Sequence, residues 1–262
     1  MITSMSNPKV KQIVSWQTKA KERRGAGVYI VEGFKMFEEA FIEEIKEVYL
    51  SQDALSLCGA DRKKRLDQTG FEVVSEEVFR KLSDTQSPQG ILCVMKRKEY
   101  ELEQFAAEHA LLVVLENLQD PGNLGTIIRT AEGAGATGVI LGPQTVDIYN
   151  PKTIRATMGS IYRVPFVYAQ DLGKAVDWLR ARGVCTYAAH LEGRKYYDGF
   201  SFQESTAFLI GNEAGGLSKE LASRADSYVK IPMSGSVESL NAAVAAALLM
   251  YEARRQRNSR KA

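Results

Sequence analysis

The chain has 262 residues, of which 45% are hydrophobic, 25% charged and 9% aromatic, and its formal net charge is +2. This ordinary globular composition excludes collagen-like, fibrous and disordered classes. No run approaches the ~18 apolar residues of a membrane span, so we expect an untargeted cytoplasmic protein. Cys58, Cys93 and Cys185 form no C-x-x-C pair, and His109 and His190 lie far apart. We therefore expect reduced core cysteines and no metal site.

The charges are distributed unevenly along the chain. Residues 1–24 carry six basic side chains against one acid, and residues 254–262 carry five basic side chains and no acid. Basic arms on a neutral scaffold are typical of proteins that bind a polyanion, although solubilising ends have the same composition. The basic residues are Lys9, Lys11, Lys19, Lys21, Arg23 and Arg24 near the start and Arg254, Arg255, Arg257, Arg260 and Lys261 near the end.

Short apolar runs in the first 95 residues alternate with helical patterns. Helices are predicted on both sides of a strand at 28–33, between residues 7 and 41. Further strands are predicted at 46–50, 71–74 and 91–95, the last after the turn-rich stretch 83–90. We expect a small α/β domain over residues 1–95. The charged, helix-prone stretch 96–109 is the predicted connection to a second domain, residues 110–262.

The second domain contains four strongly apolar runs separated by helical patterns. These runs are residues 111–117, 138–142, 207–211 and 228–232. Strands that are apolar on both faces and separated by helices predict an α/β fold with a parallel sheet covered on both sides.

Three polar, glycine-containing loops follow strands of this sheet, where ligands of parallel sheets bind. In the first, residues 116–135, Pro121 and Gly122 are the predicted turn, and Asn123 or Thr126 the cap. Arg129 would lie about 240° around a helix from Asn123, so Asn123 is placed in the loop before it.

The second and third loops supply glycines, hydroxyls and carboxylates. Residues 207–221 contain glycines that allow close backbone approach, the carboxylate of Glu213 and a candidate helix cap, Ser218. Residues 228–250 contain a polar stretch, with Glu238, Ser239 and Asn241, before a long Ala/Leu helix. Each loop alone could be ordinary turn chemistry, but three at one sheet edge indicate a binding site. The G-x-G-x-x-G and G-x-x-x-x-G-K-[ST] patterns are absent, so residue chemistry predicts only a small polar ligand.

The three loops resemble, in order, the motifs of the SpoU (TrmH-type) RNA ribose 2′-O-methyltransferases of the SPOUT superfamily. The matching stretches are DPGNLGTIIRTA, LIGNEAGGLS and IPMSGSVESLNAAVAAALLMYE. The amino-terminal part resembles the family's ribosomal-protein-like α/β domain, which binds the RNA substrate.

This resemblance implies a trefoil knot in the carboxyl-terminal domain, S-adenosyl-L-methionine as cofactor, and a homodimer whose active-site residues cross the interface. The cofactor-binding positions it implies are Ala189, Gly211, Ile231 and Leu240, with His190 beside the adenosine. The implied catalytic positions are Arg129, Asn123, Glu213, Ser239 and Asn241. The basic segment with Lys9, Lys11, Lys19, Arg23 and Arg24 is the expected RNA-binding surface. No metal is implied.

Arg129 matches a position considered catalytic in the family. An arginine is almost never deprotonated, so we expect Arg129 to stay charged, bind the adjacent phosphate and stabilise the developing alkoxide. Glu213 is expected to hold Arg129 or a loop amide, or else simply to tie its own glycine-rich loop.

The expected activity is methylation of a ribose 2′-hydroxyl in RNA, with ribosomal RNA of the 23S type favoured. A transfer RNA substrate is the nearest alternative, and a non-catalytic ribosome-assembly protein of the same fold is another. A nicotinamide-dependent enzyme is disfavoured because its glycine pattern is missing.

Overall fold

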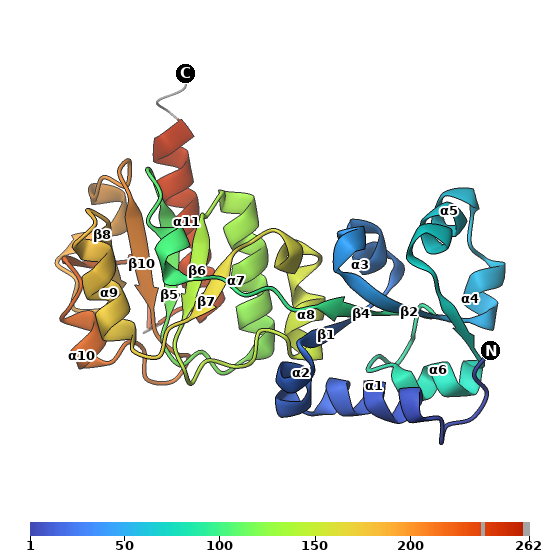
Figure 1. The fold of residues 1–262 in the computed structure, drawn as a ribbon. Coiled ribbons are helices and arrows are strands. Elements are labelled where there is room, and N and C mark those ends of the chain that lie inside the picture. Colours follow the sequence, from blue (N-terminus) through green and yellow to red (C-terminus); the bar gives the residue numbers. More distant parts are fainter. Residues whose placement is uncertain (237–238, 259–262) are drawn as a thin grey trace. The chain divides into compact units, whose positions relative to one another are not determined.

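The computed structural model describes residues 1–236 and 239–258 (Figure 1). Glu238, Arg260 and Lys261, assigned above to a polar loop and a basic tail, lie outside the described residues. The chain forms two compact units. Unit 1 comprises Met1–Lys98 and Asp147–Tyr162, and unit 2 comprises Glu99–Val146 and the residues from Arg163 onward.

Unit 1 contains a four-stranded mixed sheet of order β1-β4-β2-β3. Its strands are β1 Val28–Glu32, β2 Ile45–Ser51, β3 Glu72–Val74 and β4 Ile91–Lys96. Its helices are α1 Pro8–Thr18, α2 Ala20–Ala26, α3 Phe34–Glu39, α4 Gln52–Ser56, α5 Ala60–Thr69, α6 Glu76–Leu82 and α8 Pro151–Thr157, with 3-10 turns at Ile42–Glu44 and Ser160–Tyr162. The four predicted strands are confirmed. Two helices precede β1, because Lys19 is extended between α1 and α2.

The segment Asp147–Tyr162 belongs to unit 1, although the sequence analysis assigned it to the second domain. Arg23 forms an ion pair with Asp147 at 2.7 Å, and the rings of Tyr29 and Tyr149 lie 4.6 Å apart. The Tyr162 hydroxyl donates to a backbone carbonyl of α3. These partners are more than 100 residues apart in the chain, so local sequence patterns carry no sign of them.

Unit 2 contains a seven-stranded sheet of order β7-β6-β5-β10-β8-β11-β9, in which every strand pair is parallel. Its strands are β5 Leu111–Leu115, β6 Gly138–Leu141, β7 Phe166–Tyr168, β8 Cys185–Ala189, β9 Lys195–Tyr196, β10 Thr206–Ile210 and β11 Ser227–Lys230. The predicted parallel α/β fold is thus confirmed. β7, β8 and β9 went unpredicted because they are short and carry Lys, Thr, Tyr or Ala rather than a continuous aliphatic run.

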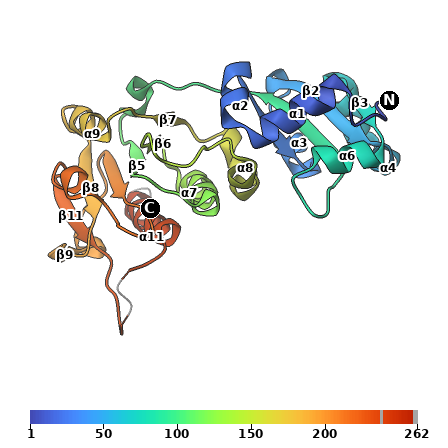
Figure 2. The same cartoon turned by 90° about the horizontal axis from the view of Figure 1, so that it is seen from below.

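Helices cover both faces of this sheet. They are α7 Pro121–Ala134, α9 Leu172–Arg180, α10 Lys219–Ala222 and α11 Ala242–Asn258, with 3-10 turns at Leu102–Phe105 and Tyr197–Gly199. Figure 2 shows α9 on one side of the strands and α7 with α11 on the other. The central strands β5 and β10 are therefore buried on both faces, which explains their unbroken apolar sequences.

Two expectations about local structure need correction. The stretch 96–109 contains only the 3-10 turn Leu102–Phe105 and no α-helix. It has few apolar residues that could pack a helix against the core. Cys58 and Cys93 are buried as expected, but Cys185 is exposed at the first position of β8. Among the described residues, no helix is long and apolar enough to cross a membrane.

Candidate active site

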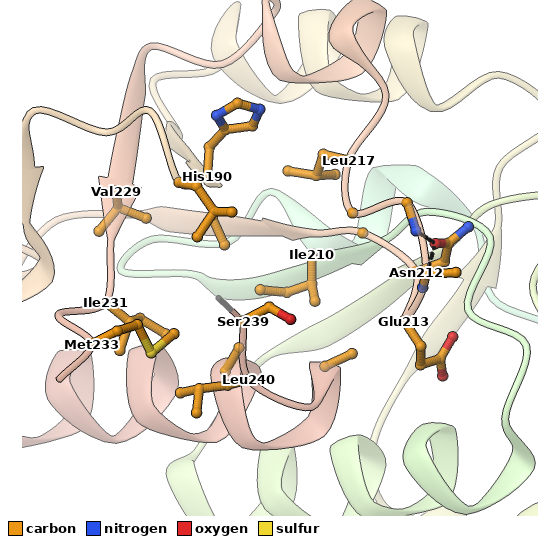
Figure 3. A pocket seen from close by; sticks show the side chains of 18 residues that line it. His190, Ile210, Asn212, Glu213, Leu217, Val229, Ile231, Met233, Ser239 and Leu240 are labelled. Carbon is orange, nitrogen blue, oxygen red and sulfur yellow. Dashed lines mark hydrogen bonds between the residues drawn. The ribbon is translucent and has the colours of Figure 1, made fainter. Parts of the chain in front are cut away.

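A cavity of about 340 Å³ lies at the carboxyl ends of β8, β10 and β11 (Figure 3). Its walls come from residues 189–191, 210–217, 229–233 and 239–245. Figure 3 shows Ile231, Met233 and Leu240 at one end of the cavity and Asn212 and Glu213 at the other. The volume falls within the range of small-molecule sites, about 300–1,000 Å³. The second and third predicted loops therefore meet around one cavity.

The residues expected to hold the cofactor all line this cavity. Ala189 ends β8, Gly211 follows β10, and Ile231 follows β11. Leu240 and Ser239 precede α11 on the same wall. Their roles in cofactor binding stay a prediction. The four expected cofactor positions are spread over 52 residues of chain, and they meet because β8 lies between β10 and β11 in the sheet.

The glycine-rich loop after β10 folds tightly back on itself. A Cβ at Gly211 would lie 1.9 Å from the carbonyl carbon of Gly216 and 2.1 Å from the nitrogen of Leu217. Gly211 therefore has to be glycine for the loop to close. The Asn212 side-chain oxygen accepts from the nitrogens of Ala214 at 3.1 Å and Gly215 at 2.6 Å, which fixes the turn.

Asn123 lies in the first turn of α7, so its placement in a loop is wrong. The cap is Asp120, whose carboxylate accepts from the Asn123 backbone nitrogen at 2.7 Å, and Pro121 occupies the first helical position. Asp followed by Pro is a recognisable helix start, because Pro has no N–H to lose and Asp accepts a free one. That signal could have found Asp120, and it also excludes Thr126 as the cap.

Three of the expected catalytic residues form one hydrogen-bonded chain. The amide of Asn241 donates to the side-chain oxygen of Asn123 at 2.9 Å. The amide of Asn123 donates in turn to the Glu213 carboxylate at 2.8 Å. Asn241 also caps α11, since its side-chain oxygen accepts from the Ala243 nitrogen at 2.9 Å. One residue from each predicted loop is thus held in a fixed orientation.

Of the alternatives expected for Glu213, the structure shows binding to amides of another loop and not to Arg129. Its carboxylate accepts from the backbone nitrogens of Gln119 and Asp120, each at 3.4 Å, besides the Asn123 amide. Partial burial raises the pKa of Glu213, but these hydrogen bonds outweigh that effect and hold its pKa below the usual value. Glu213 is therefore an anion at neutral pH.

Arg129 stands apart from the cavity. It is exposed on α7, and the described residues give it no hydrogen bond or ion pair. It lies on the helix stripe of Thr126 and Gly133, at three- and four-residue spacing. A Cβ at Gly133 would lie 2.9 Å from the Tyr251 hydroxyl of α11, so this stripe borders α11. The side chain of Arg129 is therefore exposed beside α11 and does not line the cavity.

The same border carries an apolar hollow of about 490 Å³. Val244, Leu248 and Tyr251 of α11 are 48%, 36% and 49% exposed there. The rest of its lining is Thr126, Tyr197, Ala243, Ala247, Glu252 and Arg255. The side chains of Val244, Leu248 and Tyr251 form an exposed apolar stripe on α11.

The basic amino-terminal segment divides into exposed and buried side chains. Arg23, expected to bind RNA, is 3% exposed and donates to the carbonyl oxygens of Trp16 and Gln17 and to Asp147. This expectation is corrected, because a guanidinium that is buried, and whose two terminal nitrogens bind the protein itself, cannot reach RNA. The other expected RNA-binding residues are exposed: Lys9, Lys11, Lys19 and Arg24.

Comparison with known proteins gives the family. Residues 110–251 match the SpoU rRNA Methylase family model, and residues 7–93 match the MRM3-like substrate binding domain. The chain belongs to the SpoU rRNA methylase family, the class that its parallel sheet and glycine-lined cavity fit. Within the described residues, no group of three His, Cys, Asp or Glu side chains could hold a metal ion.

Relatives match the chain over almost its full length. It is 36% identical to the 23S rRNA (guanosine(2553)-2′-O)-methyltransferase RlmP of Bacillus subtilis, over 97% of this chain and 98% of that one. The AdoMet-bound rRNA methyltransferase of Sinorhizobium meliloti superposes with a TM-score of 0.85 at 33% identity, over 97% of both chains. The SpoU methyltransferase AviRb of Streptomyces viridochromogenes, with AdoMet, gives 0.87 at 29% identity, over 97% of this chain and 99% of that one.

Proposed function

We propose that the chain transfers a methyl group from S-adenosyl-L-methionine to a ribose 2′-hydroxyl of ribosomal RNA, of the 23S type. The observation that carries this proposal is the hydrogen-bonded chain from Asn241 through Asn123 to Glu213, a residue that lines the glycine-containing cavity. The activity named for RlmP supports the substrate, and the AdoMet in two related structures supports the cofactor. Because the proposed substrate is ribosomal RNA, we expect the protein to act in the cytoplasm.

The cavity suits this cofactor because its walls are backbone and apolar side chains with few charged groups. Gly211, Ile231 and Leu240 would hold it through backbone groups and apolar contact, and His190 and Ala189 would lie beside the adenosine. S-adenosyl-L-methionine supplies an electrophilic methyl group at a sulfonium. We also retain the proposal that the carboxyl-terminal segment threads a trefoil knot around this cavity.

The protein's own residues must align the hydroxyl and lower the barrier to losing its proton. A new bond forms between the 2′-oxygen and the methyl carbon while the carbon–sulfur bond breaks, so the acceptor must approach in line. Asn123, Asn241 and Ser239 would orient the ribose. Arg129, kept charged, would bind the neighbouring phosphate and stabilise the developing negative charge on oxygen.

We infer that the protein acts as a homodimer through the α7–α11 face. Val244, Leu248 and Tyr251 form an exposed apolar stripe, and Arg129 lies on the α7 stripe at its border. Arg129 would thus serve the cavity of the partner subunit. Replacing Leu248 by Glu should yield monomers in sedimentation measurements and abolish methylation while cofactor binding persists.

Subunit mixing tests whether Arg129 acts across the interface. Arg129→Ala and Gly211→Ala should each be inactive. Their heterodimer would combine an intact cavity from the first with an intact arginine from the second, and random mixing should restore about a quarter of wild-type activity. No recovery, although mixed dimers form, would place Arg129 in its own subunit's site.

The direct test is transfer of tritium from labelled cofactor to RNA from a strain lacking the gene, with Arg129→Ala as control. Label at a single alkali-resistant linkage of 23S ribosomal RNA supports the proposal. Label in transfer RNA alone would instead select the transfer RNA alternative. Cofactor binding without label on free RNA or ribosomal particles would support a non-catalytic assembly protein.

A further inference from the structure

A second carboxylate, Glu116, joins the first loop to the glycine-rich loop at a point distinct from Glu213. Glu116 is the residue that follows β5, and its backbone nitrogen donates to the Ile210 carbonyl at 2.9 Å. Its carboxylate accepts from the Ser218 backbone nitrogen and from the Ser218 hydroxyl, each at 2.7 Å. Both carboxylate oxygens are thus engaged by one residue, 102 positions away.

Ser218 ends the glycine-rich loop that forms part of the cavity wall, and it caps α10. Gly216 and Leu217, directly before it, line the cavity, and Leu217 is 6% exposed. The Ser218 hydroxyl donates to Glu116 and accepts from the Leu221 nitrogen at 3.1 Å, which starts α10. The Glu116 carboxylate is thus the link that holds the Ser218 hydroxyl and backbone nitrogen in position relative to β5.

The two carboxylates therefore act on opposite ends of the same loop. Glu213 extends from the loop to the start of α7 and to Asn123, on the side of the proposed ribose chemistry. Glu116 extends from β5 to the end of the loop, beside Gly216 and Leu217 of the cavity wall. A rigid wall lowers the ordering cost of ligand binding.

We propose that Glu116 is a positioning residue for the cofactor, which holds the 212–218 loop closed through Ser218 and takes no part in the methyl transfer itself. The inference rests on the proposed cofactor site. It assigns to Glu116 an effect on cofactor affinity, and to Glu213 and Asn123 an effect on turnover.

Calorimetry of S-adenosyl-L-methionine binding to the full chain tests this assignment. Glu116→Ala removes both charge-assisted hydrogen bonds to Ser218 and should weaken binding about tenfold. Glu116→Gln should fall between Ala and wild type, because its amide oxygen still accepts from the Ser218 nitrogen. Turnover at saturating cofactor and RNA should stay within about twofold of wild type, since a positioning effect on binding alone leaves turnover unchanged.

Glu220→Gln is the matched control, because Glu220 is an exposed carboxylate on α10 that pairs with Arg224, whereas Glu116 is the carboxylate that binds Ser218. It should bind cofactor as wild type does. Hydrogen exchange of the 212–218 amides should accelerate in Glu116→Gln and not in Glu220→Gln. If Glu116→Ala does not fold, Glu116→Gln carries the test.

Wild-type affinity in Glu116→Gln, with unchanged exchange of the loop, would overturn the inference. Loss of turnover at saturating cofactor equal to that of Asn123→Ala would overturn it as well. Failure of the wild-type chain to bind S-adenosyl-L-methionine would instead contradict the cofactor site itself, so the two failures are distinguishable.

Discussion

The side-chain amide of Asn241 lies 2.9 Å from the side-chain oxygen of Asn123, 118 positions earlier in the chain. Each of these asparagines donates with its nitrogen and accepts with its oxygen, and the chain ends on the Glu213 carboxylate. A network with defined donors and acceptors at every link has one preferred arrangement. This arrangement lies beside the cavity, where an acceptor hydroxyl has to be oriented.

Replacing Asn241 by Asp should separate its two roles. The Asp side chain can still cap α11, but it offers no donor to Asn123 and brings a negative charge near that oxygen. We expect a thermal midpoint close to wild type and a turnover reduced about tenfold or more. Asn241→Ala should also lose about 1 kcal/mol of unfolding free energy, because the cap is gone. Equal turnover of Asp and wild type would show that the amide link is dispensable.

Removing the Arg129 side chain should affect chemistry without affecting folding. The side chain is exposed, so Arg129→Ala should shift the thermal midpoint by about 1 °C or less. Turnover should fall about 100-fold, the loss typical for one stabiliser of a developing oxyanion. Arg182→Ala serves as control, because it also removes one exposed arginine but on another part of the surface.

The pH profile of Arg129→Lys checks how Arg129 acts. An electrostatic role requires a positive charge, so single-turnover methylation should keep the wild-type profile shape at a lower rate. Disappearance of one ionisation limb in this variant alone would identify Arg129 as a proton acceptor.

A methyl group at Gly211 should displace the backbone of the loop that lines the cavity. Gly211→Ala places its Cβ within 2.1 Å of two backbone atoms of the loop, so the loop has to move. We expect cofactor affinity to fall below detection by calorimetry and unfolding free energy to fall by about 1–3 kcal/mol. Gly215→Ala is the matched control in the same loop, since its Cβ meets only the Asn212 oxygen at 3.5 Å. Comparable losses in both variants would mean that the close approach at Gly211 is not decisive.

The stabilising effect of the Glu213 charge should depend on pH in a defined direction. Its pKa in the folded state lies below the usual 4.5, so the folded state favours the anion. The contribution is complete above the unfolded pKa, near 4.5, and disappears as pH falls through the folded pKa. The stability difference between wild type and Glu213→Gln should therefore be constant from pH 6 to 8 and shrink below about pH 4.5. A difference that grows on acidification would contradict this sign.

Basic residues of the amino-terminal segment should fall into two groups. Arg23→Gln breaks a buried ion pair with Asp147 and should cost about 3 kcal/mol of unfolding free energy. Lys11→Gln and Arg24→Gln should leave stability unchanged, weaken RNA binding and reduce the salt dependence of affinity by about one unit of slope each. Chemical unfolding and RNA titrations at several salt concentrations measure both effects.

Local sequence patterns accounted for some elements and failed at others for identifiable reasons. The apolar runs of β5, β6 and β10 predicted a parallel sheet because both faces of those strands are buried. β8 was missed because its side chains are mixed. Asn123 lies in a helix rather than a loop because Asp120 and Pro121 start α7 earlier than the glycine-containing turn suggests.

By itself, the sequence determined the α/β class, the three loops at one sheet edge and, through its motifs, the family and the chemistry. These properties are local: apolar periodicity, glycine and cap positions, and the order of motifs along the chain. Only the tertiary structure decided which residues meet. It buried Arg23, grouped residues 147–162 with unit 1, joined Asn241 to Asn123 and Glu213, and attached Glu116 to Ser218. Such contacts span about 90 to 120 positions, so they depend on strand order and packing, which no local pattern encodes.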